Sequence, residues 1–216
     1  MTTYFLSGLG ADKRIFSRLA LPETLKVKHL KWIPNLKDES LGNYARRISG
    51  QIDVSESFQL VGVSFGGIVA TELAKFLKPE QVVIISSVAT RRQLPAYFGV
   101  MAYWLRSPFF SKSALKTANP LSYWLFGAAS GQTRLFFREV LEQSDGNFLK
   151  WAVVRIADWD NIIRAENLYH IHGTHDKIFP IELVKPDYVV KNGEHLMVYD
   201  KHREISDVLT ERLTTL

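Results

Sequence analysis

A short glycine-rich stretch carries the clearest chemistry in this sequence. Ser64 stands between Gly62 and Gly66, and this Gly-x-Ser-x-Gly pattern lies between a strand-like stretch (58–63) and a helix-like stretch (68–77). A strand, a tight turn and a helix in this order can raise a serine hydroxyl above the edge of a sheet as a nucleophile. The flanking residues must be glycines, because a Cβ would collide where the strand and the helix cross. A glycine-rich turn before a packed helix is the alternative interpretation.

A serine nucleophile needs a base, and the base needs an orienting acid. Asp176 follows the apolar stretch 168–171, and His195 follows a second strand-like run at 188–190. Loops that leave parallel strands meet at one edge of the sheet, so we expect both side chains close to Ser64. We predict that Ser64 is the nucleophile, that His195 acts as general base and then acid, and that Asp176 orients the imidazole.

An acyl-transfer site also needs two N–H donors for the oxyanion that develops in the reaction. The backbone N–H of Phe65, at the start of the helix after the nucleophile, is one candidate. The backbone N–H of Leu9 is the other, because residues 7–10 (SGLG) directly follow the first strand-like stretch. An ordinary strand-to-helix turn is the alternative interpretation of residues 7–10.

These motifs together resemble those of serine hydrolases with the α/β-hydrolase fold, in particular esterases with a helical lid. The resemblance rests on GVSFGG at 62–67, HGTHDKIFP at 172–180 and GEHLMV at 193–198. It implies chemistry without a cofactor or a metal. The chain departs from the family at its oxyanion loop, where Ser7 stands at a position commonly held by histidine.

Strand-like and helix-like stretches alternate through both ends of the chain. The expected strands are 2–7, about 26–32, 58–63, 82–85, 168–172 and 187–191. The expected helices are about 12–20 with Asp12 as N-cap, about 40–52 with Ser40 as N-cap, one that Pro79 ends, and one that closes the chain. The alternation predicts a single α/β domain over residues 1–216. Its mostly parallel sheet should have about six strands with helices on both faces.

The alternation stops between about residues 90 and 160, where more than half of the aromatic residues gather. A structureless loop of this length inside a compact domain would be unusual, so we expect several helices with breaks near Pro95, Pro108 and Pro120. They are inserted after the fourth strand and are expected to form a lid over the carboxyl edge of the sheet. The core is then 1–89 and 161–216.

Bulky aromatic side chains of the lid are the expected lining of an apolar substrate pocket above Ser64. The candidates are Tyr97, Tyr103, Trp104 and Trp124. Packing within the lid's own core is the alternative for any one of them, and a membrane-surface role for residues 121–126 is a weaker alternative.

Two further acidic residues, Asp158 and Asp160, could replace Asp176 as the orienting acid. Their position at the end of the lid favours a hinge or a helix cap instead. No acidic residue directly follows the strand-like run 82–85, which is the other usual place for this acid, so Asp176 is preferred.

Composition argues against several other classes of protein. The chain has no cysteine, which excludes disulfides, thiolate nucleophiles and thiolate metal sites. His170, His172 and His175 beside Asp176 would allow a metal site, but this region is more typical of the acid loop, and we predict no metal. The net charge is +5, yet the basic residues are scattered and no nucleic-acid-binding motif is present, so no nucleic-acid partner is predicted.

Neither a signal peptide nor an apolar run of membrane-spanning length is found, so we expect a cytoplasmic protein without stable membrane insertion. The predicted function is cleavage of a small or medium carboxylic ester or thioester, a small-molecule acyl substrate, through an acyl-enzyme. Two alternatives stay open: an enzyme of the same fold that is non-hydrolytic or cleaves carbon–carbon bonds, and a binding protein without catalysis.

Overall fold

Six parallel strands form one sheet in the computed structural model, which describes residues 1–107 and 110–215. Pro108, one of the expected helix breaks, and Phe109 lie outside the described residues. The strands are β1 (Thr2–Leu6), β2 (Lys26–His29), β3 (Phe58–Val63), β4 (Gln81–Ile85), β5 (Leu168–Gly173) and β6 (Tyr188–Val190). They pair in the order β2-β1-β3-β4-β5-β6, and each pair is parallel. The predicted six-stranded parallel sheet is confirmed.

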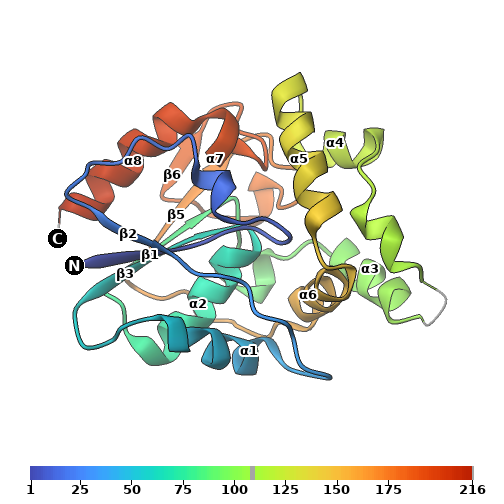
Figure 1. Cartoon of the computed structure of the whole chain (residues 1–216), viewed down its shortest axis with the longest axis horizontal. Helices are drawn as coiled ribbons and strands as arrows, with labels where there is room; N and C mark the ends of the chain where they lie inside the picture. The colour runs from blue at the N-terminus through green and yellow to red at the C-terminus, as the bar shows by residue number, and fades with distance from the viewer. Residues whose placement is uncertain (108–109, 216) are drawn as a thin grey trace.

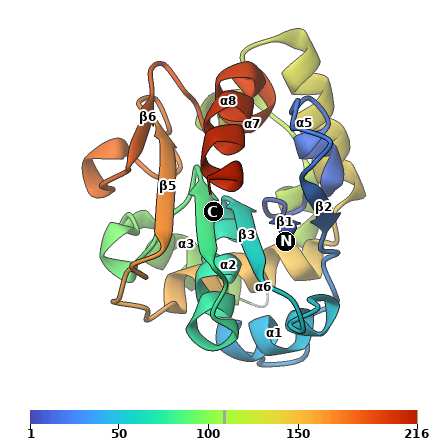
Figure 2. The same ribbon diagram turned by 90° about the vertical axis from the view of Figure 1, so that its left-hand side faces the viewer.

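Helices cover both faces of this sheet, as predicted. The α-helices are α1 (Leu41–Ile48), α2 (Phe65–Leu77), α3 (Tyr97–Arg106), α4 (Pro120–Phe126), α5 (Gly131–Gln143), α6 (Gly146–Asp158), α7 (Met197–Asp200) and α8 (His202–Thr214). Short 3-10 helices span Lys13–Phe16, Ser49–Gln51, Arg91–Gln93, Lys112–Lys116 and Ile181–Leu183. Figure 2 shows α1 and α2 on one side of the sheet and α8 on the other.

The core consists of two apolar layers, one on each face of the sheet. Successive side chains of a strand point to opposite faces, so a strand buried on both faces is apolar throughout. On β4, Val82 and Ile84 pack with residues of α1, α2 and α6, whereas Val83 and Ile85 pack with residues of α7 and α8. The continuous apolar runs that mark β3 and β4 in the sequence follow from this arrangement.

The helix predicted over residues 12–20 is wrong in length, because only Lys13–Phe16 is helical. Asp12 does act as its N-cap and accepts the N–H of Arg14. The turn then ends because the Ala20 N–H donates to the hydroxyl of Ser206 on α8, at 2.9 Å, instead of continuing a helix. Pro22 further disfavours helical backbone at the residue before it.

The segment between β4 and β5 is helical, as expected, and α3, α4 and α5 gather at the end of the molecule opposite the two termini (Figure 1). Buried side chains of α6 enter the core layer next to α1 and α2, together with Phe98, Ala102 and Leu105 of α3. The Trp151 ring lies 4.7 Å from the ring of Tyr44, and its indole N–H donates to the carbonyl oxygen of Glu39. The division into a core and a lid over 90–160 stays a prediction.

Within the described residues, every helix is too short or too polar to cross a bilayer.

Candidate active site

Ser64 occupies the turn between β3 and α2 in a strained backbone conformation. Its φ is 53° and its ψ is −120°, a combination that side-chain-bearing residues rarely adopt. Two hydrogen bonds hold the turn: the Ser64 N–H donates to the carbonyl oxygen of Ile85 at 2.9 Å, and the Ser87 hydroxyl donates to the Ser64 carbonyl oxygen at 2.7 Å. Both partners lie at the end of the neighbouring strand β4, so the sheet itself fixes the serine.

The glycines around Ser64 are required by close backbone approach. A Cβ on Gly62 would collide with the backbone of Gly66, and a Cβ on Gly66 would collide with the carbonyl oxygens of Leu6 and Ser7. Helix α2 can therefore begin directly above the ends of β3 and β1 only because these residues lack side chains.

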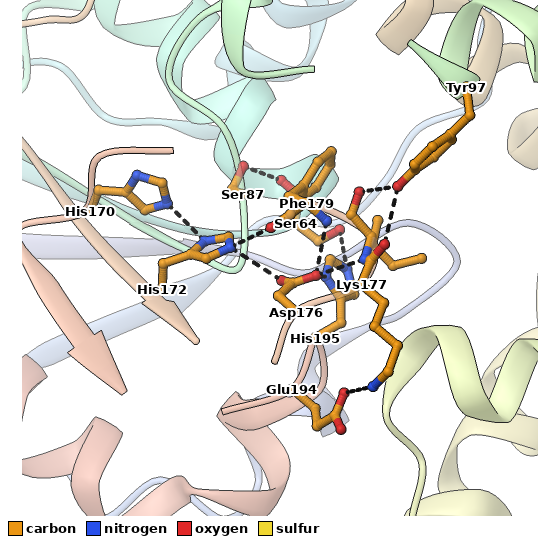
Figure 3. Close-up of polar contacts among 11 residues, drawn as sticks. Ser64, Ser87, Tyr97, His170, His172, Asp176, Lys177, Phe179, Glu194 and His195 are labelled. Atoms are coloured by element: carbon orange, nitrogen blue, oxygen red, sulfur yellow. Dashed lines mark hydrogen bonds and ion pairs between the residues drawn. The ribbon is translucent and has the colours of Figure 1, made fainter. Parts of the chain in front are cut away.

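The structure brings Ser64, His195 and Asp176 together in one line of hydrogen bonds (Figure 3). The Nε2 atom of His195 lies 2.9 Å from the Ser64 Oγ. On the other side of the ring, Nδ1 lies 2.9 Å from Oδ2 of Asp176 and 3.1 Å from Oδ1. The three residues follow β3, β6 and β5, so the carboxyl edge of the sheet brings them together.

Asp176 is a buried carboxylate with many hydrogen-bond donors. The backbone N–H groups of Ile178 and Phe179 both donate to Oδ1, each at 2.9 Å. Burial by itself would raise the pKa of Asp176, but the neighbouring His195, His172 and the backbone donors lower it below its usual range. The carboxylate is therefore ionised and correctly oriented to accept a hydrogen bond from Nδ1 of His195.

Two buried histidines lie behind Asp176. The Nε2 atom of His172 lies 2.7 Å from the carbonyl oxygen of Phe179 and 3.6 Å from Oδ2 of Asp176. Because a carbonyl oxygen only accepts, His172 carries its proton on Nε2, and its Nδ1 accepts from Nε2 of His170 at 3.1 Å. Burial lowers the pKa of both rings, that of His170 to about 3, so both are neutral.

The loop expected to supply an oxyanion donor is held against the serine. The Ser7 hydroxyl donates to the carbonyl oxygen of Ala11 at 2.7 Å, and the Ala11 N–H donates to the carbonyl oxygen of Gly8 at 3.1 Å. The indole N–H of Trp32 donates to the same Gly8 oxygen, and a Cβ built on Gly8 would lie 3.6 Å from Cβ of Ser64. Leu9 follows in this loop, while Phe65, as the first residue of α2, has an N–H that the helix leaves unpaired.

Aromatic rings that the sequence analysis did not assign surround the imidazole of His195. The rings of Phe126 and Phe179 lie 5.4 Å and 5.7 Å from it. The Phe126 carbonyl oxygen also accepts the N–H of Leu196, so α4 holds the loop that carries His195. Phe126 stood within the aromatic-rich segment, but a spacing in sequence could not select it from its neighbours.

Solved structures of other proteins share this architecture over nearly their whole length. A hydrolase from Oleispira antarctica has a TM-score of 0.75 at 13% identity, with 100% of this chain and 92% of that one covered. A thermophilic esterase from Thermogutta terrifontis has a TM-score of 0.74 at 13% identity, covering 99% and 89%. A lipase-esterase related protein from Clostridium acetobutylicum ATCC 824 has a TM-score of 0.71 at 18% identity, covering 97% and 93%.

The chain has the α/β-hydrolase fold. No protein-family model matches the sequence, and no curated protein does. The similarity therefore lies in the arrangement of strands and helices. In this α/β-hydrolase fold, the loops after β3, β5 and β6 carry Ser64, Asp176 and His195.

The four aromatic residues predicted to line a pocket lie at different places on the α/β-hydrolase fold. The Tyr97 hydroxyl donates to the carbonyl oxygen of Lys177, beside Asp176, and the Lys177 ammonium lies 5.4 Å from the centre of the Trp124 ring. Tyr103 and Trp104 are 73% and 63% exposed and contact each other on α3. Their assignment to a substrate pocket stays a prediction.

The contacts of Asp158 and Asp160 differ from those of Asp176. Asp158 pairs with Arg106 and Arg155, and Asp160 is exposed, whereas Asp176 contacts His195. Within the part of the chain that is described, no group of three or more acidic or histidine side chains could hold a metal ion.

Proposed function

We propose that this protein is a serine hydrolase that cleaves a small or medium carboxylic ester, or a thioester, through a covalent acyl-enzyme. The observation that carries the proposal is the continuous line of hydrogen bonds from the Ser64 hydroxyl through His195 to the ionised Asp176. A serine hydroxyl is a weak nucleophile by itself, and this arrangement gives it a base whose orientation is fixed.

In the first step, the Ser64 Oγ attacks the carbonyl carbon of the ester while Nε2 of His195 takes the hydroxyl proton. The imidazolium then donates this proton to the departing alkoxide, or thiolate, and an acyl-serine ester remains. Water attacks this ester with His195 again as the base, and the acid is released as Ser64 is restored.

Negative charge on the carbonyl oxygen is stabilised, in this proposal, by the backbone N–H groups of Phe65 and Leu9. Donors that are already in place cost no reorganisation during the reaction, and loss of one typically lowers the rate about 10²–10³-fold. The contacts of Ser7 and Trp32 with the loop before Leu9 support this assignment, because they hold that loop beside Ser64.

The neutral state of His172 also matters for the proposed step. His172 approaches Asp176 with an N–H but without a positive charge, so the negative charge of the carboxylate stays available to the imidazolium of His195.

We further propose that the helices between β4 and β5 act as a lid and that Tyr97, Tyr103, Trp104 and Trp124 contact the substrate. We also propose that the protein acts in the cytoplasm.

Labelling with a fluorophosphonate probe tests the proposal without knowledge of the substrate. We expect the probe to form one covalent adduct, on Ser64, located by mass spectrometry. Ser64→Ala should abolish the label and lower hydrolysis of p-nitrophenyl esters by about 10⁴–10⁶-fold, because the nucleophile is lost while the fold is kept. Exposed Ser113 offers a matched control, and Ser113→Ala should label normally.

A folded protein that stays unlabelled, or is labelled at another serine, would contradict the proposal. A panel that contains both esters and diketones separates the main alternatives. Turnover of diketones alone would indicate the carbon–carbon-cleaving alternative, and labelling without turnover of either class would favour a binding protein of the same fold.

A further inference from the structure

Helices α3 and α4 expose large apolar side chains that α-helices of a monomeric domain normally bury. Those on α3 are Val100, Tyr103 and Trp104, and those on α4 are Leu121 and Trp124. Trp124 is 59% exposed and Val100 and Leu121 are more so. We call these five residues the α3–α4 apolar surface. An apolar patch rich in Trp and Tyr indicates an interaction site.

The charge of this region has one sign. Residues 81–138 contain seven Lys and Arg but no Asp or Glu. Lys112 and Lys116 lie on the 3-10 helix between α3 and α4, and within the described residues neither pairs with an acidic side chain. Arg106 and Arg138 pair with Asp158 and Glu142 from outside this stretch, so the positive charge without an acidic partner near α3 and α4 includes that of Lys112 and Lys116.

Both helices border the loop that carries Asp176. Tyr97, at the start of α3, donates to the Lys177 carbonyl oxygen, while the Lys177 ammonium lies over the ring of Trp124 on α4. Figure 1 shows α3 and α4 at the same end of the molecule, opposite both termini. The two helices thus belong to one end of the protein.

We propose that the α3–α4 apolar surface docks on an anionic lipid bilayer. Trp and Tyr side chains prefer the interface between headgroups and acyl chains, and Lys and Arg next to them gain free energy from anionic headgroups. A second copy of the chain fits less well, because two-fold pairing would bring Lys112 and Lys116 of one copy towards those of the other. The protein lies on the membrane in this arrangement and does not cross it.

This inference goes beyond the proposed esterase function and does not depend on it. Docking would bring α4 to the lipid, and the Phe126 ring on the same helix contacts His195. The candidate active site would then open close to the bilayer, where apolar esters concentrate.

Vesicle co-sedimentation tests the proposal with the full chain carrying Ser64→Ala, so that binding is measured without turnover. Vesicles of phosphatidylcholine alone are compared with vesicles that contain about one-third phosphatidylglycerol. We expect binding to the anionic vesicles to be at least about tenfold stronger, and to weaken when salt is raised to about 0.5 M.

Two pairs of substitutions locate the docking surface. Trp104→Ser with Trp124→Ser, and separately Lys112→Glu with Lys116→Glu, should each weaken binding about tenfold or more. The matched control for charge is Lys26→Glu with Lys28→Glu, on the exposed edge strand β2. It changes the net charge equally but should alter binding less than about twofold.

Three results would overturn the proposal. The first is a natively folded Ser64→Ala protein that does not bind anionic vesicles. The second is an equal loss of binding in the β2 control, which would indicate attraction by net charge alone. The third is concentration-dependent self-association that Trp104→Ser with Trp124→Ser abolishes, because a second copy would then cover the surface. Hydrolysis of a soluble ester by the unaltered protein, measured separately, tests the proposed function.

Discussion

Ser7 stands in the expected oxyanion loop at a position commonly held by histidine. Its hydroxyl bridges the turn by donating to the Ala11 carbonyl oxygen, and this contact shapes the loop that contains Leu9. Because the proposed oxyanion donors are backbone N–H groups, the side chain only has to hold the loop in place. A small buried hydroxyl can do so without occupying the space above Ser64.

We expect Ser7→Ala to lower kcat of ester hydrolysis about tenfold with little change in KM, because a displaced Leu9 N–H would affect the transition state most. The free energy of unfolding should fall by only about 1 kcal/mol, the usual value of one hydrogen bond. Steady-state kinetics and urea denaturation measure the two effects.

The control for Ser7→Ala is Ser206→Ala on α8, which removes a similarly buried hydroxyl that donates to the His202 carbonyl oxygen and accepts the Ala20 N–H. It should lower stability at least as much as Ser7→Ala, because two hydrogen bonds are lost, and leave kcat unchanged. Equal losses of kcat in both variants would show that Ser7 contributes to stability alone.

The sequence predicted the positions of those side chains that the backbone of a parallel sheet determines. The meeting of Ser64, His195 and Asp176 could be expected because the ends of parallel strands share one edge. The contacts of Trp32 with Gly8 and of Phe126 with His195 could not be, since they depend on how loops and helices pack in three dimensions.

Among the elements, β5 is a strand that carries two fully buried histidines. Its residues His170 and His172 lie on one face of the strand, and a hydrogen bond joins Nε2 of His170 to Nδ1 of His172. A strand-like run with two histidines also fits a metal site, and only the orientation of the rings distinguishes the two arrangements. The end of the 3-10 helix at Phe16 was also not predictable from the sequence, because it depends on the hydrogen bond from the Ala20 N–H to the Ser206 hydroxyl on α8.

The buried His170 should make the protein sensitive to acid. Its pKa falls from 6.5 to about 3 on folding, so between these values the unfolded chain binds a proton that the folded chain does not. Stability from this group is complete above about pH 6.5 and is lost as the pH falls, by at most about 1.4 kcal/mol per pH unit.

Urea denaturation between pH 6.5 and 5 measures this effect. We expect the unaltered protein to lose about 2 kcal/mol more than His170→Gln over this range. Neighbouring His172, Asp176 and Arg164 are present in both proteins, so the difference isolates His170. Replacement of the exposed His175 by Gln should follow the unaltered protein, and parallel curves for His170→Gln would contradict the prediction.

For the whole molecule, α6 joins the inserted helices to the sheet. It follows α5 in sequence, yet its buried side chains belong to the layer between the sheet, α1 and α2. The Trp159 indole N–H, directly after α6, donates to the buried Glu72 carboxylate on α2 at 2.6 Å. The inserted segment and the sheet should therefore unfold together.

A comparison of two tryptophans tests this coupling. Trp151→Ala should lower the free energy of unfolding by about 3–5 kcal/mol, because it leaves a cavity in the core layer. Trp104→Ala should change it by less than about 0.5 kcal/mol, since that side chain is largely exposed. Far-ultraviolet circular dichroism and tryptophan fluorescence should report a single urea transition; two separate transitions would show that the segment folds independently.

The hydrogen bond from Leu196 to the last residue of α4 has a consequence for how molecules reach the site. A helix that both shields the imidazole and steadies the loop beneath it cannot be lifted without loosening that loop. A wide entrance for the substrate and a well-ordered His195 are therefore incompatible. We expect narrow substrates that pass α4 without displacing it to react fastest.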